Sequence, residues 1–522
     1  MPQEEFTQKE KQILSRFCTN VEGDVFALMN LPDVIKGTLF SRYSRSQKSL
    51  KRLLLDEFIN SDEIDLEAMV GNTEGASQLL AIGKAEKFYE RVLVQYGDDS
   101  VAELGGAHLA LENVSNLATK FIEDRRIGIS PLEKSTRYVY FNEKVNGEYR
   151  YYRDGLIMGS KKKEAERAKG GTVPTTVLIS PTMRCNLRCT GCYAMEYKRE
   201  DDLPFEVVDR IIKEGKKMGV AFFTFLGGEP MVWPHLFRLF EKHSDVFFQF
   251  YTNSTLINEK TAEELLKLGN AIPILSIEGF EKRTDERRGE GTYKKIMKAM
   301  DILGKNRIPF GFSAAVSSKN AEEISSDKFI DFMIEKGAYL GWFFLYMPVG
   351  AKPDPKLMPT PKQRLHLYKR DIKLRETKPI FIIDFWNDAP WVGGCIAGKE
   401  YLHITSTGDV EPCIFTHMAV DNIKNKSLKE VLNSDYFKAL RKRQPYHDNL
   451  FLPCQWIDHP EVSREMMKKY NLKCTHPGAD DPIRDRKVRA AIDKYSKEVR
   501  KLYAPVWKKS EFYKDLVRKG EI

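Results

Sequence analysis

The sequence has no long hydrophobic run, and this absence excludes a large class of proteins. No apolar stretch approaches the ~20 residues that a membrane-spanning helix requires, so no transmembrane segment is expected. The N-terminus is polar and acidic, unlike a secretory signal. A strong charge of one sign is also lacking, because 83 basic residues against 74 acidic ones leave a net charge of only +9 over 522 residues. That excess gives no clear indication of nucleic-acid binding.

Cysteine is scarce, with 8 residues in the chain, and it does not form the even framework of a small disulfide-rich secreted protein. This usage favours a reducing, cytoplasmic location. Against this background Cys185, Cys189 and Cys192 stand within eight residues. Three thiolates at this spacing can hold an iron–sulfur cubane and leave its fourth iron free for an outside ligand. The alternative is a set of buried free thiols.

The segment Arg184–Tyr193 around these cysteines resembles the radical SAM enzyme family, and downstream segments strengthen the likeness. Gly227–Pro230 resembles the family's glycine-rich segment, which binds the methionine part of S-adenosylmethionine. Tyr251–Thr255 and Ser276–Gly279 resemble the stretches that follow its third and fourth strands. The family often has an aromatic residue immediately before the third cysteine, where this chain has Gly191. The resemblance implies a [4Fe-4S] cluster with S-adenosylmethionine, and cofactor contacts from Tyr193, Gly227, Gly228, Glu229, Pro230, Asn253, Glu278 and Ser313.

Short β-rich runs alternate with amphipathic helices between about residues 174 and 350, a pattern that predicts a parallel α/β sheet. The family resemblance implies that this sheet is a partial (β/α)6 TIM-like barrel. The cysteine triplet, Gly227, Asn253 and Glu278 all follow predicted strands. We expect them to converge at one mouth, because sites in such sheets lie at the carboxyl ends of strands. The predicted strands are Thr175–Ser180, Ala221–Leu226, Phe247–Thr252, Ile272–Ile277, Phe310–Val316 and Leu340–Tyr346.

A second group of cysteines follows the barrel, comprising Cys395, Cys413, Cys454 and Cys474. Alternating residues in 401–405 and a Thr-Gly-Asp turn predict a hairpin that brings Cys395 and Cys413 together. The surrounding segments resemble the SPASM or twitch extensions of radical SAM enzymes, which implies a second iron–sulfur cluster. Structural zinc is the main competing interpretation, and inert thiols are the next.

The N-terminal third is mostly helical by pattern, and parts of it resemble flavin-dependent thymidylate synthases. Residues 96–103 resemble that family's substrate-side helix start, and residues 125–138 resemble its signature, with Arg126 in place of the usual histidine. The resemblance makes flavin a candidate cofactor, and we expect a catalytically silent descendant that serves binding or assembly. Arg42, Arg45 and Lys48 could form a phosphate-binding face, or simply a solvated charged face.

These patterns divide the chain into five parts. We expect a helical domain over 1–155, a linker over 156–173, the barrel over 174–360, the cluster extension over 361–480 and terminal helices over 481–522. In the last part an apolar stripe of Val488, Ile492, Tyr495, Val499 and Leu502 predicts a helix that docks on the body, rather than one that lies on a membrane surface.

The radical SAM resemblance implies a specific chemistry. One electron from a donor such as ferredoxin or flavodoxin would split S-adenosylmethionine at the cluster, and the resulting 5′-deoxyadenosyl radical would take hydrogen from an unidentified substrate. The extension favours a peptide or protein substrate, and no catalytic residue beyond the cluster is assigned. Two other hypotheses stay open: a nucleotide- or flavin-linked modification enzyme whose N-terminal domain binds a uridylate-like ligand, and a non-catalytic iron–sulfur electron-transfer protein.

Overall fold

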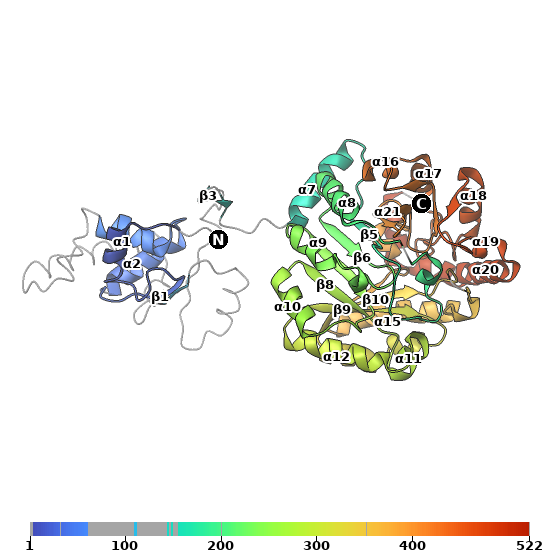
Figure 1. The fold of residues 1–522 in the computed structure, drawn as a ribbon, viewed down its shortest axis with the longest axis horizontal. Coiled ribbons are helices and arrows are strands. Elements are labelled where there is room, and N and C mark those ends of the chain that lie inside the picture. The colour runs from blue at the N-terminus through green and yellow to red at the C-terminus, as the bar shows by residue number, and fades with distance from the viewer. Residues whose placement is uncertain are drawn as a thin grey trace, which may run out of the picture. The chain divides into compact units, whose positions relative to one another are not determined.

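The computed structural model describes residues 4–31, 33–60, 109–111, 144–145, 148–149, 155–199, 201–350 and 352–520 (Figure 1). The chain divides into two compact units, Met1–Arg153 and Asp154–Ile522. Both thymidylate-synthase-like motifs, at 96–103 and 125–138, lie outside the described residues. None of the helices that the structure describes has the length and hydropathy of a membrane span.

The described part of the first unit is a small helical cluster. A capping box between Thr7 and Glu10 begins its first helix, and Leu14, Leu39 and Leu50 form part of a fully buried core. Its helices are α1 (Gln8–Leu14), α2 (Asp33–Ser44), α3 (Leu50–Leu53) and the π-helix η1 (Leu54–Ile59). Two short antiparallel pairs complete it, β1 (Val25–Ala27) with β2 (Leu109–Leu111) and β3 (Lys144–Val145) with β4 (Glu148–Tyr149).

The second unit is built on a ten-stranded sheet with the order β11-β10-β9-β8-β7-β6-β5-β12-β13-β15. Strands β5 to β11 are parallel and adjacent in chain order, as repeated β-α-β crossovers require. All six predicted strands are present, and β11 adds a seventh from the region assigned to the extension. The strands are β5 (Thr176–Ile179), β6 (Phe222–Phe225), β7 (Phe247–Thr252), β8 (Ala271–Ser276), β9 (Phe310–Val316), β10 (Ala338–Leu345) and β11 (Phe381–Asp384).

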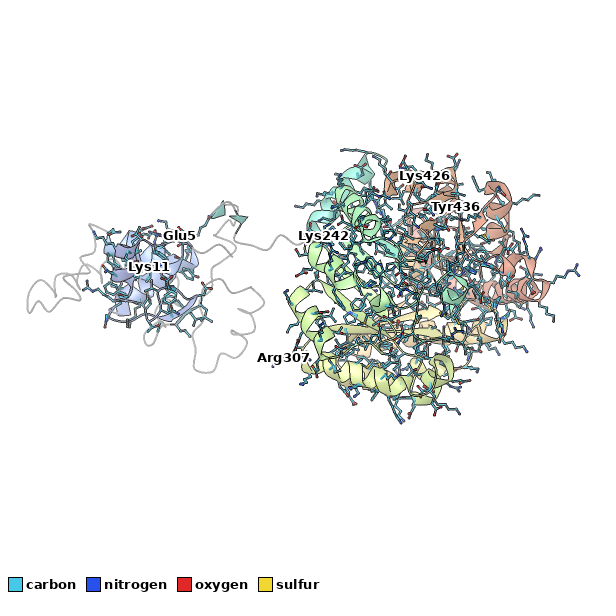
Figure 2. The ribbon with its side chains drawn as sticks, viewed as in Figure 1. Glu5, Lys11, Lys242, Arg307, Lys426 and Tyr436 are labelled. Carbon is cyan, nitrogen blue, oxygen red and sulfur yellow. The ribbon has the colours of Figure 1, made fainter. Side chains whose placement is uncertain are left out.

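Amphipathic helices cover the outer side of these strands (Figure 1). Helix α10 is typical: Asn258 caps its start, Ala262 and Leu265 are buried against the sheet, and Gly269 ends it in the left-handed conformation. Charged side chains such as Lys242 and Arg307 lie on the periphery of the unit (Figure 2). The helices are α8 (Phe205–Met218), α9 (Leu236–Lys242), α10 (Glu259–Leu268), α11 (Glu281–Arg288), α12 (Thr292–Lys305), α13 (Ala321–Ile324), α14 (Asp327–Glu335) and α15 (Pro361–Thr377).

The extension continues the sheet beyond β5. Strand β12 (Tyr401–Ile404) pairs in parallel with β5, and β13 (Asp409–Glu411) returns antiparallel to β12, so the predicted hairpin is confirmed. The remaining strands are β14 (Met418–Ala419), β15 (Asp421–Asn422) and β16 (Lys473–Cys474). Four 3-10 turns, η3 (Tyr193–Glu196), η4 (Pro230–Val232), η5 (Pro355–Leu357) and η6 (Ala389–Val392), lie in loops of the unit.

Two terminal segments pack on this body. Helix α7 (Gly155–Ala168) lies where the sequence indicated a linker, and its Lys163 and Arg167 form ion pairs with Glu400, at 3.3 and 2.7 Å. Helix α20 (Arg486–Lys509) buries the predicted apolar stripe and therefore docks as expected, except that Tyr503 rather than Leu502 completes it. The other helices are α16 (Leu428–Leu432), α17 (Asp435–Arg443), α18 (Pro460–Tyr470), α19 (Asp481–Arg484) and α21 (Glu511–Lys519).

Candidate metal centre

The three clustered cysteines lie in the loop that leaves the carboxyl end of β5. The Sγ atom of Cys185 accepts the backbone N–H of Leu187 at 3.4 Å, and the Cys192 N–H donates to the Cys189 carbonyl at 3.3 Å. The Thr190 N–H donates to the carbonyl of Arg287 at 2.8 Å, which fastens the loop to the end of α11. All three thiols are partly exposed. A single short loop at the carboxyl end of β5 therefore carries all three sulfur donors.

The electrostatics of this loop suit a bound cation cluster. Burial, together with the smaller effects of the neighbouring Glu229, Cys189 and Cys192, raises the pKa of Cys185 to about 11 although the Leu187 N–H lowers it. Burial also raises the pKa of Cys189, whereas Arg288 lowers it. Three thiolates held this close need compensating positive charge, which iron would supply. The donor set therefore fits an iron–sulfur cluster.

Within the described ranges, no three His, Cys, Asp or Glu side chains surround a point where one metal ion could bind. A cubane makes a different demand, because each thiolate binds its own iron and the sulfurs stand further apart than around a single ion. The absence of a single-ion site among the described residues therefore does not test the cubane.

Gly227 and Gly228 are required by the cysteine loop itself. Gly227 has φ +122°, and a Cβ there would lie 2.4 Å from the Thr182 carbonyl oxygen. A Cβ on Gly228 would lie 2.2 Å from the Arg184 carbonyl oxygen. The Gly228 and Glu229 N–H groups donate to these same two carbonyls at 3.0 and 2.9 Å. The glycine-rich segment therefore packs directly on the backbone that carries Cys185.

Glu229 is fully buried, and its carboxylate is occupied by protein donors. It accepts the N–H of Asn253 at 2.7 Å, the Thr252 hydroxyl at 2.9 Å and the N–H of Met231 at 3.1 Å. The last contact caps the turn η4, which begins at Pro230. Burial raises the pKa of Glu229 to about 7 although these hydrogen bonds lower it. The cofactor contact that the resemblance implies for Glu229 would have to share a carboxylate that already joins this segment to β7.

Asn253 connects the end of β7 to the cysteine loop. Its Nδ2 donates to Asn186 Oδ1 at 2.8 Å and lies 3.7 Å from Cys185 Sγ, while its Oδ1 accepts the Thr255 N–H and hydroxyl. The next residue, Ser254, has φ +70°, a left-handed conformation at the position where the family usually has glycine. Asn253 therefore supports the residues around the first sulfur.

Glu278 and Ser313 follow on the next strands of the mouth. Glu278 is 1% exposed. Its Oε1 accepts a hydrogen bond from Arg288 Nη2 at 2.6 Å, and its Oε2 lies 3.6 Å from Arg287 Nη1. Ser313 is buried on β9 with its hydroxyl 3.4 Å from that of Ser276. Glu278 thus holds Arg288 beside Cys189, which is a more specific role than the cofactor contact that the resemblance implies.

The aromatic that the sequence lacked at Gly191 is supplied from elsewhere. A Cβ on Gly191 would lie 2.7 Å from the ring of Tyr346, which follows β10. Tyr193 donates its hydroxyl to the Gly227 carbonyl at 3.3 Å. Glycine at 191 was the one local signal, and only the folded chain identifies Tyr346 as the ring that fills its space.

Cys395, Cys413 and Cys454 gather around Tyr401 in the extension. The Tyr401 hydroxyl donates to Cys413 Sγ at 2.9 Å. Burial raises the pKa of Tyr401 well above its usual range, and the thiols of Cys413, Cys395 and Cys454 raise it further. Burial raises the pKa of Cys413 to about 12.

Cys474 has different surroundings. It pairs with Met418 between β16 and β14. Burial raises the pKa of Cys474, and the charges that then act on it most are those of Asp480, which raises it, and Arg484, which lowers it. The fourth cysteine is therefore the one whose surroundings differ from those of the other three.

A buried ion pair positions Cys454. Arg364 on α15 and Asp458 are both fully buried, with Arg364 Nη1 2.6 Å from Asp458 Oδ1. The other Asp458 oxygen accepts the Cys454 N–H at 3.0 Å. Neither residue has a local sequence signal, because they are 94 positions apart.

A buried polar network joins the end of β5 to the extension. Ser180 Oγ lies 2.7 Å from His403 Nε2, and His403 Nδ1 lies 2.6 Å from Glu411 Oε2. The other Glu411 oxygen accepts the Tyr197 hydroxyl at 2.7 Å. Ser180, His403 and Glu411 are fully buried, so the network ties the strands next to both cysteine groups together.

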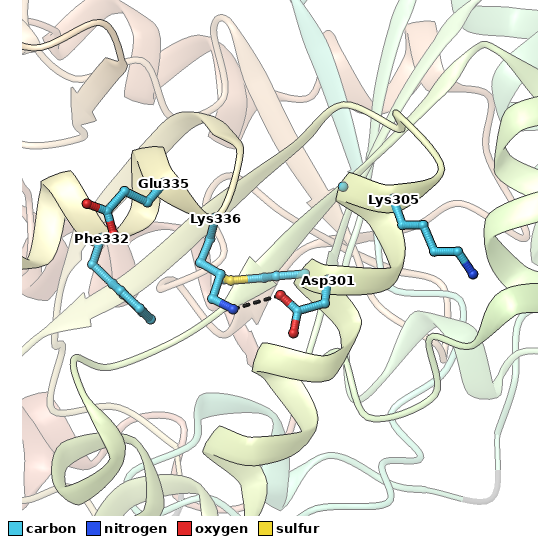
Figure 3. Close-up of a pocket in the computed structure, with 7 residues that line it drawn as sticks. Asp301, Lys305, Phe332, Glu335 and Lys336 are labelled. Atoms are coloured by element: carbon cyan, nitrogen blue, oxygen red, sulfur yellow. Dashed lines mark hydrogen bonds and ion pairs between the residues drawn. The ribbon is translucent and has the colours of Figure 1, made fainter.

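Two other features lie apart from this chemistry. A surface hollow between α12 and α14, near the Asp301–Lys336 ion pair, is on the outer helical layer (Figure 3). In the first unit, Arg42 pairs with Glu57 at 2.8 Å and Lys48 with Asp56 at 3.0 Å. Those basic side chains are therefore engaged with carboxylates of η1 in this structure.

Comparison with known families agrees with this geometry. Residues 179–327 match the radical SAM superfamily, and residues 395–455 match an iron–sulfur cluster-binding domain, SPASM. The chain therefore contains a radical SAM domain followed by a SPASM domain. Radical SAM domains bind a [4Fe-4S] cluster with S-adenosylmethionine, and SPASM domains bind further iron–sulfur clusters.

Individual relatives match different parts of the chain. A UPF0159 protein of Chlamydia pneumoniae is 58% identical over 165 residues, 31% of this chain and 30% of that protein, and the likeness is to the N-terminal third. An AdoMet-dependent heme synthase of Methanosarcina barkeri is 25% identical over 298 residues, 51% of this chain and 85% of that protein. The sporulation killing factor maturation protein SkfB of Bacillus subtilis is 24% identical over 271 residues, 50% of this chain and 65% of that protein.

Proposed function

We propose that this protein is a radical SAM oxidoreductase or modifying enzyme that takes a hydrogen atom from its substrate. The observation that carries the proposal is the loop of Cys185, Cys189 and Cys192 at the carboxyl end of β5, within the matched radical SAM region. With a [4Fe-4S] cluster and S-adenosylmethionine bound, the site would supply one-electron cleavage to a 5′-deoxyadenosyl radical. An electron donor such as ferredoxin or flavodoxin is implied.

The protein's own residues would orient this site and screen it from water. Asn253 hydrogen-bonds to Asn186 in the cysteine loop, and the glycine-rich segment packs on the backbone of that loop. Arg288, fixed by Glu278, offsets thiolate charge beside Cys189. Tyr346 packs at Gly191 and would restrict water there.

The inner face of the barrel offers an aromatic wall for the substrate. Trp342 and Phe344 stack at 5.6 Å and 3° on β10, and Phe344 contacts Tyr251 and Phe385 at 5.9 and 5.5 Å. These four rings are partly exposed, unlike Phe343 and Leu345 on the opposite face of β10. The Trp342 indole N–H is buried without a partner. A substrate group that accepts a hydrogen bond would satisfy it.

A peptide or protein is our first candidate substrate. The SPASM domain and the similarity to SkfB, which is named as a maturation protein, support this class. A tetrapyrrole is the second candidate, because the heme synthase relative is covered over 85% of its length and a planar ring would stack on the aromatic wall.

A nucleotide-linked role for the N-terminal third is a further proposal. The thymidylate synthase-like resemblance of this third supports it, and the 58% identity to the UPF0159 protein agrees with that resemblance. The pairing of Arg42 and Lys48 with carboxylates does not favour a phosphate site at those residues. Raised thermal stability with deoxyuridylate, or co-purified flavin, would support the nucleotide proposal. The absence of both would count against it.

The decisive experiment is anaerobic reconstitution followed by dithionite and S-adenosylmethionine. Formation of 5′-deoxyadenosine is expected, and none at all would leave the non-catalytic electron-transfer hypothesis. Stimulation of cleavage by a peptide or by a tetrapyrrole precursor would then separate the two substrate classes. The matched control is Cys18→Ala, which removes a buried thiol from the first unit and should leave cleavage unchanged.

A further inference from the structure

A shared local turn marks some cysteines of this chain. Cys413 Sγ accepts the N–H of Phe415, and Cys454 Sγ accepts the N–H of Trp456, both at 3.4 Å. The contact repeats the one between Cys185 Sγ and the Leu187 N–H, also at 3.4 Å. In each case the donor is two residues after the cysteine. Such N–H groups stabilise a thiolate and orient it before metal arrives.

Cys395 belongs to the same group. The backbone N–H of Ala397, again two residues on, is a hydrogen-bond donor to the Cys395 thiol, as are the side chains of Tyr446 and Gln444. These three cysteines come from separate segments, and the sulfurs gather around one phenol, that of Tyr401. The matched SPASM region, 395–455, contains all three.

Cys474 departs from this pattern in two respects. Its backbone hydrogen bond comes from Asp480, six residues further on, and not from the residue two positions later. It also lies outside the matched region. A strand pairing with Met418, rather than a cysteine turn, fixes its backbone.

We propose that the second iron–sulfur cluster is held by three thiolates, Cys395, Cys413 and Cys454, with Cys474 outside the ligand set and Tyr401 hydrogen-bonded to the Cys413 sulfur. The proposal rests on the cluster chemistry of the proposed function. One iron of a cubane then has no cysteine and takes an exchangeable ligand, such as cyanide or an imidazole. This set differs from the four cysteines expected from the sequence.

The Tyr401 phenol would also tune this cluster. A hydrogen bond to a ligand sulfur favours the more negative, reduced cluster and raises its reduction potential. Tyr436 offers a matched control, because it is a buried tyrosine of the same extension. Burial and the charge of Cys413 raise the pKa of its phenol, but no hydrogen bond to sulfur contributes to that shift. Its position is labelled in Figure 2.

The ligand set is tested in a full-length chain with Cys185, Cys189 and Cys192 changed to Ala, so that only the second cluster can form. After anaerobic reconstitution, Cys474→Ser in this background should keep about four irons per chain, as a [4Fe-4S] cluster requires. Cys413→Ser and Cys454→Ser should lose most of them. Equal iron loss in Cys474→Ser and Cys413→Ser would overturn the proposal, provided that circular dichroism shows the Cys474→Ser chain folded. If that chain is unfolded, Cys474→Ala is measured by the same criterion.

Two further measurements complete the test. Cyanide should change the electron paramagnetic resonance signal of the reduced background protein, and an unchanged signal would show a protein ligand on the fourth iron and overturn the open position. Tyr401→Phe should shift the potential of the second cluster downward, whereas Tyr436→Phe should not. Equal shifts would overturn the role of Tyr401. Failure of S-adenosylmethionine cleavage by the unmodified chain, with these results intact, would count against the proposed function alone.

Discussion

The two cysteine sites of the second unit reach a similar donor set by different routes. The first places Cys185, Cys189 and Cys192 in one loop after one strand. The second collects Cys395, Cys413 and Cys454 from segments that meet only after β12 and β13 have formed their hairpin. The first is therefore encoded locally, whereas the second depends on tertiary structure.

Their neighbours differ as well. Arginine side chains stand beside the first site, with Arg288 lowering the pKa of Cys189 against the effect of burial. The second site has the neutral hydroxyl of Tyr401 on a sulfur. The first site therefore has cations beside its thiols, whereas the second combines a neutral hydroxyl on one sulfur with the buried Arg364–Asp458 pair behind Cys454.

The sharpest separation of the two sites comes from removing the first. Changing Cys185, Cys189 and Cys192 to Ala should abolish 5′-deoxyadenosine formation and lower iron from about eight to about four per chain, because each cubane holds four irons. Iron and sulfide analysis with product chromatography checks this. A variant with no iron at all would mean that the second site does not stand independently.

Breaking the buried ion pair should instead damage the second site. Arg364→Met leaves Asp458 charged and unpaired in the interior, and we expect a loss of about 3–5 kcal/mol in the free energy of unfolding. Denaturant unfolding measures it, and the second cluster should lose iron because Asp458 holds the Cys454 backbone. Lys267→Met is the control, since its partner Glu241 is exposed and a change within about 0.5 kcal/mol is expected. Similar losses in both variants would contradict the prediction.

A smaller effect confined to the first site should follow from Gly228→Ala. The added Cβ would meet the Arg184 carbonyl at 2.2 Å, so the cysteine loop must shift, at about 1–3 kcal/mol. Iron should fall at the first cluster and stay at the second. Gly304→Ala in α12 has its nearest neighbour at 3.9 Å and should be neutral or slightly stabilising. Normal first-cluster iron in Gly228→Ala would remove the packing argument.

The smallest expected effect concerns Glu229 and pH. Its folded pKa of about 7 lies above the ordinary 4.5, so the native chain binds this proton more tightly than the unfolded chain between those values. The stability contribution of Glu229 is thus present below about pH 4.5 and is lost as pH rises through about 7. In Glu229→Gln this slope should disappear. Urea unfolding of the cluster-free chain at several pH values tests it, and equal slopes in both proteins would refute it.

Much of the barrel could be predicted because its periodicity is local. The predicted strands at 247–252 and 310–316 have the observed bounds, and the convergence of Cys185, Asn253 and Glu278 follows from strand direction alone. β11 was not predicted, because this strand has only four residues and lies in the region assigned to the extension. Helix α7 was missed because few apolar residues mark it, and its docking depends on Glu400, far along the chain.

The residues that support the two sites were harder to predict from the sequence. Tyr346 reaches Gly191 only through the fold, and Arg364 finds Asp458 across 94 positions. Glu229 was predicted to contact the cofactor, and its carboxylate accepts hydrogen bonds from backbone donors that no spacing rule identifies. Long-range packing decides such contacts.

The register between β12 and β5 has one further consequence. Tyr401 lies level with Thr176, where β5 begins, whereas the loop with Cys185 leaves its end. The three residue steps from Thr176 to Ile179, at about 3.3 Å each, separate these levels by roughly 10 Å. The spacing between the two cysteine sites along this direction is therefore set by a shared β-ladder rather than by a hinge.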